Sequence, residues 1–151
     1  MSDLRDLYQE LILDHTKRPR NFGLLEAANC QADGYNPLCG DKITVFLSVA
    51  DGLVQDARFQ GSGCAISTAS ASMMTETVKG KPLTEVEQLF EKFHQMLTGS
   101  SDVGAETYDQ LGKLAVFSGV KEFPVRVKCA TLAWHTLRAA LKHEQQPVST
   151  E

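Results

Sequence analysis

The chain has 151 residues, a length typical of one ordinary domain with its own hydrophobic core. Its 15 lysines and arginines against 19 aspartates and glutamates give a net charge of −4, which argues against a general nucleic-acid-binding protein. The N-terminal residues are charged where a secretory leader is apolar, and no stretch reaches the length of a membrane helix, so we expect a soluble cytoplasmic protein without membrane or nucleic-acid partners.

The first segment has the spacing of an amphipathic helix. Apolar side chains recur three and four residues apart, at Leu4, Leu7, Tyr8, Leu11 and Ile12. Pro19 cannot continue a helix, and Lys17 and Arg18 suit the negative end of the helix dipole. The sequence therefore predicts a helix that ends just before Pro19.

The next segment predicts strands. Residues 43–49 are rich in β-branched and aromatic side chains, and Asp51-Gly52 is a turn signal. Residues 53–59 supply a second strand, so the two segments form a hairpin. The residues before Asn36-Pro37 supply a third strand, at the edge of the sheet.

The remainder predicts helices over residues 66–78, 83–97 with Thr84 as N-cap, 108–117, and a last helix reaching Leu141. Strands followed by helices indicate an α+β fold, with an antiparallel sheet of about three strands and helices packed on one face. We expect a single domain over residues 1–144 and a polar, disordered tail over residues 145–151.

Four cysteines in a reducing compartment suggest metal ligands or reactive thiols rather than disulfides. Cys39 lies in a turn between Pro37 and Gly40, where Asp41 follows two residues later. Cys64 follows Gly61-Ser62-Gly63 at a strand-to-helix junction, where the helix dipole favours a thiolate. Cys129 lies near the start of the last helix. Cys30 stands in a polar stretch without a motif, and we predict that it is a core residue or simply exposed.

Cys39, Cys64 and Cys129 with Asp41 form a set of three soft sulfur ligands and one hard oxygen ligand. Such a set suits tetrahedral zinc, and it equally suits an iron–sulfur cluster. No CxxC pair is present, so the spacing alone does not decide between them. His15, His94, His135 and His143 all fall on predicted helices, and the sequence places none of them beside a cysteine.

The cysteine motifs NPLCGD (residues 36–41), GSGCAIS (61–67) and KCATLAW (128–134), in this order, resemble the U-type iron–sulfur cluster assembly proteins, which include IscU and the NifU N-terminal domain. Asp14-His15 and residues 19–23 are similar to the same family's N-terminal segment. The likeness covers residues 4–141. Within the family, the chain resembles the SufU-type branch rather than the IscU-type scaffolds.

Two departures from the scaffold pattern indicate this branch. The scaffolds have a histidine directly before the third cysteine, where this chain has Lys128. The interval of about 65 residues between Cys64 and Cys129 is also longer. Loss of the histidine removes a candidate cluster ligand and proton carrier, whereas three cysteines and Asp41 can still close a zinc site.

The resemblance implies Zn²⁺ held by Cys39, Asp41, Cys64 and Cys129, with Cys39 as the catalytic sulfur acceptor. It also implies two kinds of partner: a pyridoxal-phosphate-dependent cysteine desulfurase, which supplies persulfide sulfur, and downstream iron–sulfur assembly proteins. We further hypothesise that Arg126 either pairs with Asp41 or guides an anionic persulfide. Two alternatives stay open: a scaffold that carries a transient iron–sulfur cluster, and a non-catalytic adaptor domain with a structural zinc.

Overall fold

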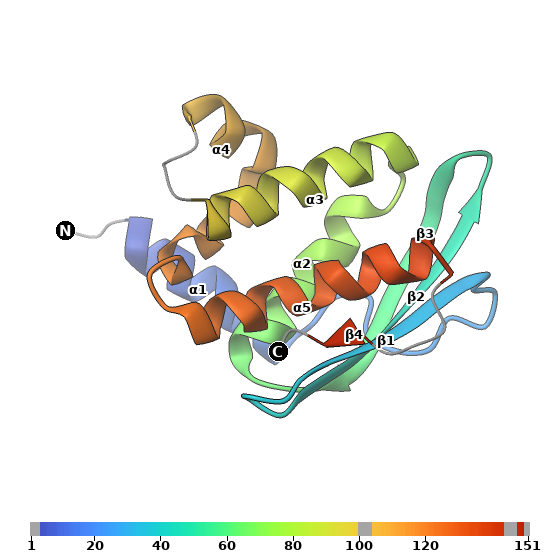
Figure 1. Cartoon of the computed structure of the whole chain (residues 1–151), viewed down its shortest axis with the longest axis horizontal. Coiled ribbons are helices and arrows are strands. Elements are labelled where there is room, and N and C mark those ends of the chain that lie inside the picture. The colour runs from blue at the N-terminus through green and yellow to red at the C-terminus, as the bar shows by residue number, and fades with distance from the viewer. Residues whose placement is uncertain (1–3, 100–103, 144–147, 150–151) are drawn as a thin grey trace.

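Three long antiparallel strands form the sheet of this computed structural model, and helices cover one face of it (Figure 1). The structure describes residues 4–99, 104–143 and 148–149. In chain order the elements are α1 (Leu4–Lys17), β1 (Cys30–Asn36), β2 (Asp41–Ala50), β3 (Leu53–Ser62), α2 (Ala65–Val78), α3 (Leu83–Thr98), α4 (Ala105–Leu111), η1 (Gly112–Val120), α5 (Pro124–Leu141) and β4 (Val148–Ser149). The predicted α+β fold is confirmed.

The sheet is built from two successive hairpins. β1 pairs with β2, so that Asn36 faces Asp41 beside the connecting turn, and β2 pairs with β3 through Asp51-Gly52. The sheet order is β3-β2-β1-β4, and the two residues of β4 run parallel to β1 opposite Gly34 and Tyr35. Of the predicted disordered tail, residues 145–147 and 150–151 lie outside the described residues. The other two form β4.

The helices follow the predicted order, with two differences at their boundaries. Thr84 is not an N-cap: α3 begins at Leu83 after Pro82, and the Leu83 N–H donates to the Gly52 carbonyl of the β2–β3 turn at 2.9 Å. The helix predicted over residues 108–117 is divided, because α4 ends at Leu111 and the chain continues from Gly112 as the 3-10 helix η1.

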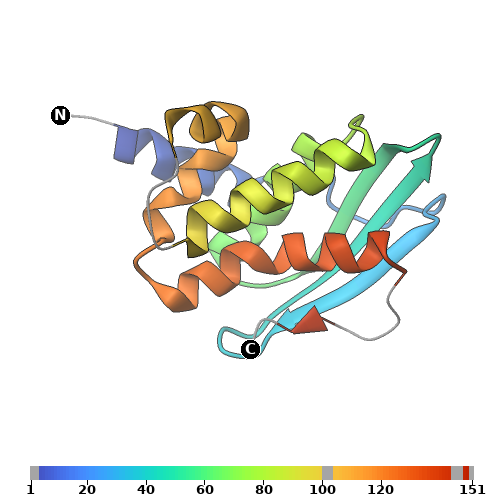
Figure 2. The same cartoon turned by 45° about the horizontal axis from the view of Figure 1, so that its top comes forward.

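The core lies between the sheet and the pair α2 and α5. α5 contacts β1 and β2, α2 contacts β3, and the two helices contact each other (Figure 2). Small side chains let α2 approach closely: Ala69, Ser70 and Ala71 are fully buried, and the Ser70 hydroxyl donates to the Ala130 carbonyl at 2.6 Å. Phe93 of α3 stacks on Trp134 of α5, with ring centroids 4.9 Å apart. No helix within the described ranges has the length and apolar character needed to span a membrane.

Candidate metal centre

Three chain segments meet at one end of the sheet. The β1–β2 turn carries Cys39, β2 begins at Asp41, and Cys64 is the N-cap residue of α2 directly after β3. The turn and the β3–α2 connection lie at the same end of the sheet in both views (Figures 1 and 2). Cys129 reaches this end from α5, one and a half turns after the helix begins at Pro124.

The structure brings three of the four predicted ligands into one group and places Cys64 beside it. The ligand atoms of Cys39, Asp41 and Cys129 all lie within 4.8 Å of one another, and the two sulfurs among them are 3.2 Å apart. Cys64 joins through Asp41, whose Oδ2 is 3.8 Å from the Cys64 Sγ. Asp41 is fully buried and Cys129 is buried, whereas Cys64 is half-buried and Cys39 is exposed.

Asp41 is fixed by the backbone of the β3–α2 connection. Its Oδ1 accepts the Cys64 N–H at 2.8 Å. A Cβ on Gly63 would lie 2.7 Å from the same oxygen, so this close approach requires glycine. Gly40, which was expected to take an unusual φ, has φ +71° between Cys39 and Asp41. Gly40 and Gly63, one in each motif, therefore help to fix the position of the Asp41 carboxylate.

The two helical cysteines are fixed in different ways. The Cys64 Sγ accepts the Ser67 N–H at 3.4 Å, as an N-cap side chain does. Cys129 lies in the interior. Burial raises the pKa of its thiol above the ordinary value, and its contacts with Cys39, Cys64 and Asp41 raise it further. Its sulfur lies 3.2 Å from the Cys39 sulfur, to which it donates.

The donor set fits a zinc ion. Ligand atoms around tetrahedral zinc are roughly 3.3–3.8 Å apart, because Zn–S bonds are about 2.3 Å and Zn–O bonds about 2.0 Å. The 3.2 Å between the Cys39 and Cys129 sulfurs and the 3.8 Å between Cys64 Sγ and Asp41 Oδ2 are close to this range. Cys64 lies outside the group of three ligand atoms that are mutually within 4.8 Å, so its sulfur must approach the others for all four to bind one ion. Three sulfur ligands also match the preference of zinc for soft donors.

Three further residues differ in their relation to this centre. Cys30 is a buried core residue at the far end of β1, roughly 20 Å from Asn36 along the strand, so it takes no part in this centre. The predicted Arg126–Asp41 pair does not form: the Arg126 guanidinium lies over the Phe123 ring, 4.8 Å from its centroid. Asn36, which the sequence analysis gave no role, lies fully buried between Asp41 and Cys129.

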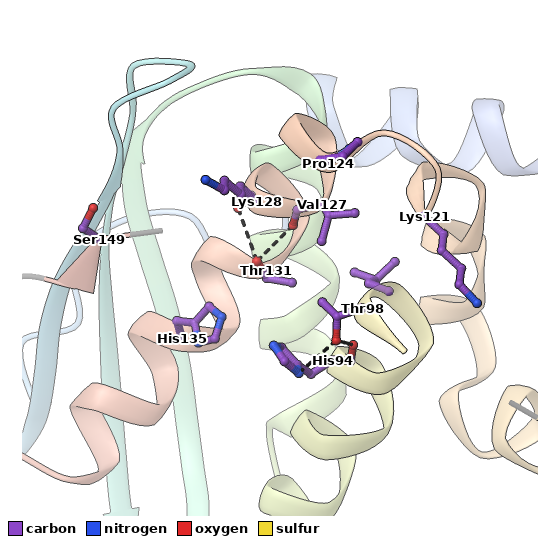
Figure 3. Close-up of a pocket in the computed structure, with 10 residues that line it drawn as sticks. His94, Thr98, Lys121, Pro124, Val127, Lys128, Thr131, His135 and Ser149 are labelled. Carbon is purple, nitrogen blue, oxygen red and sulfur yellow. Dashed lines mark hydrogen bonds between the residues drawn. The ribbon is translucent and has the colours of Figure 1, made fainter. Parts of the chain in front are cut away.

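A separate cavity of about 510 Å³ lies between α3 and α5 (Figure 3). His94 and His135 point toward one another in it, and their ring centroids are 5.5 Å apart. Burial lowers the pKa of His135 below its usual value, and His94 and Arg138 add to this effect. None of the residues that line this cavity is a cysteine, so the cavity is separate from the cluster around Asp41.

The chain is similar to proteins of one family, both in sequence and in structure. The model of the NifU-like N terminal domain matches residues 7–130. The zinc-dependent sulfurtransferase SufU of Bacillus subtilis is 40% identical over 95% of both chains, and the iron–sulfur cluster assembly scaffold protein IscU of Thermotoga maritima is 41% identical over 93% of this chain and 96% of its own. A crystal structure of a SUF-system protein from Fervidobacterium islandicum superposes with a TM-score of 0.81 at 34% identity, over 92% of this chain and 99% of the other.

Proposed function

This chain belongs to the NifU-like N terminal domain family, and from that premise we propose that it is a zinc-dependent sulfur acceptor that works with a cysteine desulfurase. Several relatives are named as iron–sulfur cluster assembly scaffold proteins, and the general role in iron–sulfur cluster assembly extends to the chain. One relative is named a sulfurtransferase and another a scaffold, and their sequence identities to this chain are nearly equal. The choice between these two activities therefore depends on the site itself.

One observation carries the proposal: the four candidate ligands differ in exposure. Cys39 stands exposed on a hairpin turn, while Asp41 and Cys129 are buried and Cys64 is anchored by the start of α2. A large partner can therefore reach one sulfur without disturbing the other three groups. A sulfur acceptor needs such a division between a reactive thiolate and a fixed support.

We assign zinc to Cys39, Asp41, Cys64 and Cys129. When bound, the metal supplies a positive charge that keeps the thiols deprotonated at neutral pH and protects them from oxidation. The acidic oxygen of Asp41 is the weakest ligand by softness. Because burial raises the pKa of the Cys129 thiol, metal binding must release its proton to solvent.

The transfer itself is a thiol–disulfide type exchange at Cys39. The Cys39 thiolate attacks the outer sulfur of the partner's protonated cysteine persulfide, and a new S–S bond forms at Cys39. The partner's S–S bond breaks, its electron pair returns to the partner cysteine as a thiolate, and the persulfide proton travels with the outer sulfur. No oxidant or reductant is consumed. The pyridoxal-phosphate-dependent desulfurase supplies the persulfide.

Lys128 argues against the scaffold alternative. It directly precedes Cys129, and a protonated lysine offers no lone pair to an iron atom, unlike an imidazole. The structural-zinc alternative is weakened by Asp41, because closed structural zinc sites are typically built from cysteine and histidine ligands.

The test mixes the zinc-loaded protein with the desulfurase and free cysteine, and measures alanine release. We expect stimulation that Cys39→Ala abolishes, whereas the matched variant Cys30→Ala, a buried cysteine outside the centre, retains it. If the wild type gives no stimulation but forms a stable coloured cluster on anaerobic reconstitution, the scaffold function is correct instead. Loss of the fold in Cys39→Ala, with neither activity in the wild type, would favour the adaptor domain.

A further inference from the structure

Asn36 is a fully buried amide at the last position of β1, opposite Asp41 in the ladder. Its Nδ2 lies 3.4 Å from the Asp41 Oδ2 and 3.4 Å from the Cys129 Sγ, so one NH₂ group serves two candidate ligands. Its Oδ1 accepts the Leu38 N–H at 3.2 Å, and its backbone carbonyl accepts the Cys39 N–H at 3.3 Å. Because these hydrogen bonds would be lost if the buried side chain turned, the Asn36 amide is held in one orientation.

The amide donors around the centre are distributed unequally. Asp41 accepts from the Cys64 N–H and from Asn36, Cys129 accepts from Asn36, and the Cys64 sulfur accepts from the Ser67 N–H. Among the described residues, the hydrogen bond given for the Cys39 sulfur comes from the Cys129 thiol.

This inequality has a chemical consequence. Three thiolates and a carboxylate carry four negative charges, and a divalent metal leaves two of them uncompensated. Amide donors stabilise that excess charge on Asp41, Cys64 and Cys129. Within the part of the chain that the structure describes, no amide donates to the Cys39 sulfur, so it is the most nucleophilic of the three sulfurs and the one that leaves the metal at least cost.

We propose that Asn36 is a positioning residue that makes Cys39 the exchangeable ligand, by holding Asp41 and Cys129 in place through its side-chain amide. This inference rests on the proposed zinc-dependent function and adds to it the reason why one of three cysteines is selected. Asn36 acts on the centre through Asp41 and Cys129 and touches no substrate.

Two variants separate the parts that Asn36 plays. Asn36→Ala removes both the NH₂ donor and the acceptor for Leu38. Asn36→Asp is close to isosteric and keeps the acceptor for Leu38, but it places a further negative charge beside Asp41 and Cys129. Asn29→Ala is the matched control, because Asn29 also bonds backbone through its amide, at Val49, but at the other end of β1.

The first readout is zinc affinity, measured by competition with a chromogenic chelator. We expect Asn36→Ala to weaken zinc binding about 10- to 100-fold, the usual effect of removing a group that supports a metal ligand, and Asn36→Asp to weaken it further. The second readout is alkylation of the zinc-loaded protein, resolved by cysteine with peptide mass spectrometry. In the wild type, Cys39 reacts well before Cys64 and Cys129. In both Asn36 variants, the rate at Cys129 rises toward the rate at Cys39.

Wild-type zinc affinity together with an unchanged order of alkylation in both folded variants would overturn the inference. Far-UV circular dichroism establishes folding, and Asn36→Asp serves as the test if Asn36→Ala does not fold. The outcome is also separable from the proposed function. A wild type that holds zinc and accepts sulfur while the variants behave like it disproves only the role of Asn36, whereas a wild type without zinc disproves both.

Discussion

Asp41 connects the centre to the backbone of the sheet and of α2. One oxygen accepts the Cys64 N–H at 2.8 Å, and the other lies 3.4 Å from Asn36 and 3.8 Å from the Cys64 sulfur. The residue is the first of β2, so the register between β1 and β2 sets its position. The carboxylate is thus a rigid part of the centre, although it is the least suited to zinc by softness.

Gly63→Ala tests this rigidity. The new Cβ would lie 2.7 Å from the Asp41 Oδ1, so the carboxylate must move and its bond to the Cys64 N–H weakens. We expect zinc affinity to fall about tenfold or more, measured by chelator competition. Gly119→Ala is the control, since a Cβ there meets no atom within 4 Å. Equal zinc affinity in the two variants would show that Asp41 is not held as described.

At the residue scale, the sequence motifs predicted which side chains come together but not all of what supports them. Cys39 and Asp41 lie on either side of Gly40, and Cys64 directly follows Gly63, so both motifs can be recognised locally. The role of Asn36 depends on Cys129, 93 residues away, and so could not be read from the motif. Its position two residues before the Leu38 N–H, a spacing typical of a turn closed by an Asn side chain, is the one local signal. The Arg126–Asp41 pair was wrong because Asp41 is fully enclosed, which only the packing of three segments reveals, whereas a role of Arg126 toward an anionic persulfide stays a prediction.

At the element scale, α1 is attached to α2 through a buried histidine. His15 is 1% exposed, and its Nδ1 lies 2.6 Å from the Ser72 hydroxyl, which also accepts the Arg20 N–H. Burial lowers the pKa of His15 below its ordinary value of 6.5, and Arg20 and Lys113 add to this, while Glu76 and Asp14 oppose it. The helix is therefore docked through a neutral imidazole.

This pairing predicts a pH-dependent stability. As the pH falls below about 6.5, the unfolded chain binds a proton at this histidine before the folded chain does, so the free energy of unfolding decreases until the lowered pKa is passed. The slope is at most about 1.4 kcal/mol per pH unit for one histidine. We expect urea unfolding between pH 7.5 and 5.5 to show a smaller decrease in His15→Asn than in the wild type.

The control for this experiment is His143→Gln, whose side chain is exposed after α5. His135 contributes a share of the same sign, because burial also lowers its pKa. If His15→Asn loses as much stability on acidification as the wild type and the control do, the docking of α1 does not depend on a neutral His15.

Elements were predictable where their signals are local. Asp51-Gly52 predicted the β2–β3 hairpin, and Pro19 predicted the end of α1. The division of α4 from η1 was missed although Gly112 marks it locally: this glycine ends α4 with φ +57°, a backbone conformation that glycine adopts readily. The pairing of β4 with β1 joins residues more than 100 positions apart, which no local pattern encodes.

At the scale of the whole molecule, the core and the centre are separate. The largest fully buried side chains, such as Trp134, Phe93 and Phe117, lie among α3, η1 and α5. Cys39, Cys64 and Cys129 instead lie at one end of the sheet. A chain of 151 residues buries enough apolar surface to fold without a metal. The metal should therefore stabilise the fold without being required for it.

Chelation tests this separation. Protein purified without chelator should contain about one zinc per chain by elemental analysis. Removal of the zinc should leave the far-UV circular dichroism unchanged and lower the melting temperature by several degrees, because a ligand at 100 times its dissociation constant adds about 2.7 kcal/mol of stability. Cooperative loss of the helical signal on chelation would instead indicate a structural zinc.

The central claim is that Cys39 receives the sulfur. Its direct test is a single turnover in which the zinc-loaded chain meets a desulfurase carrying a persulfide, followed by alkylation and peptide mass spectrometry. The account predicts that the added sulfur atom is on the peptide containing Cys39 and is absent from that containing Cys30. A desulfurase that loses its persulfide while Cys39 gains no sulfur, or a sulfur found on Cys64 or Cys129 instead, would contradict it.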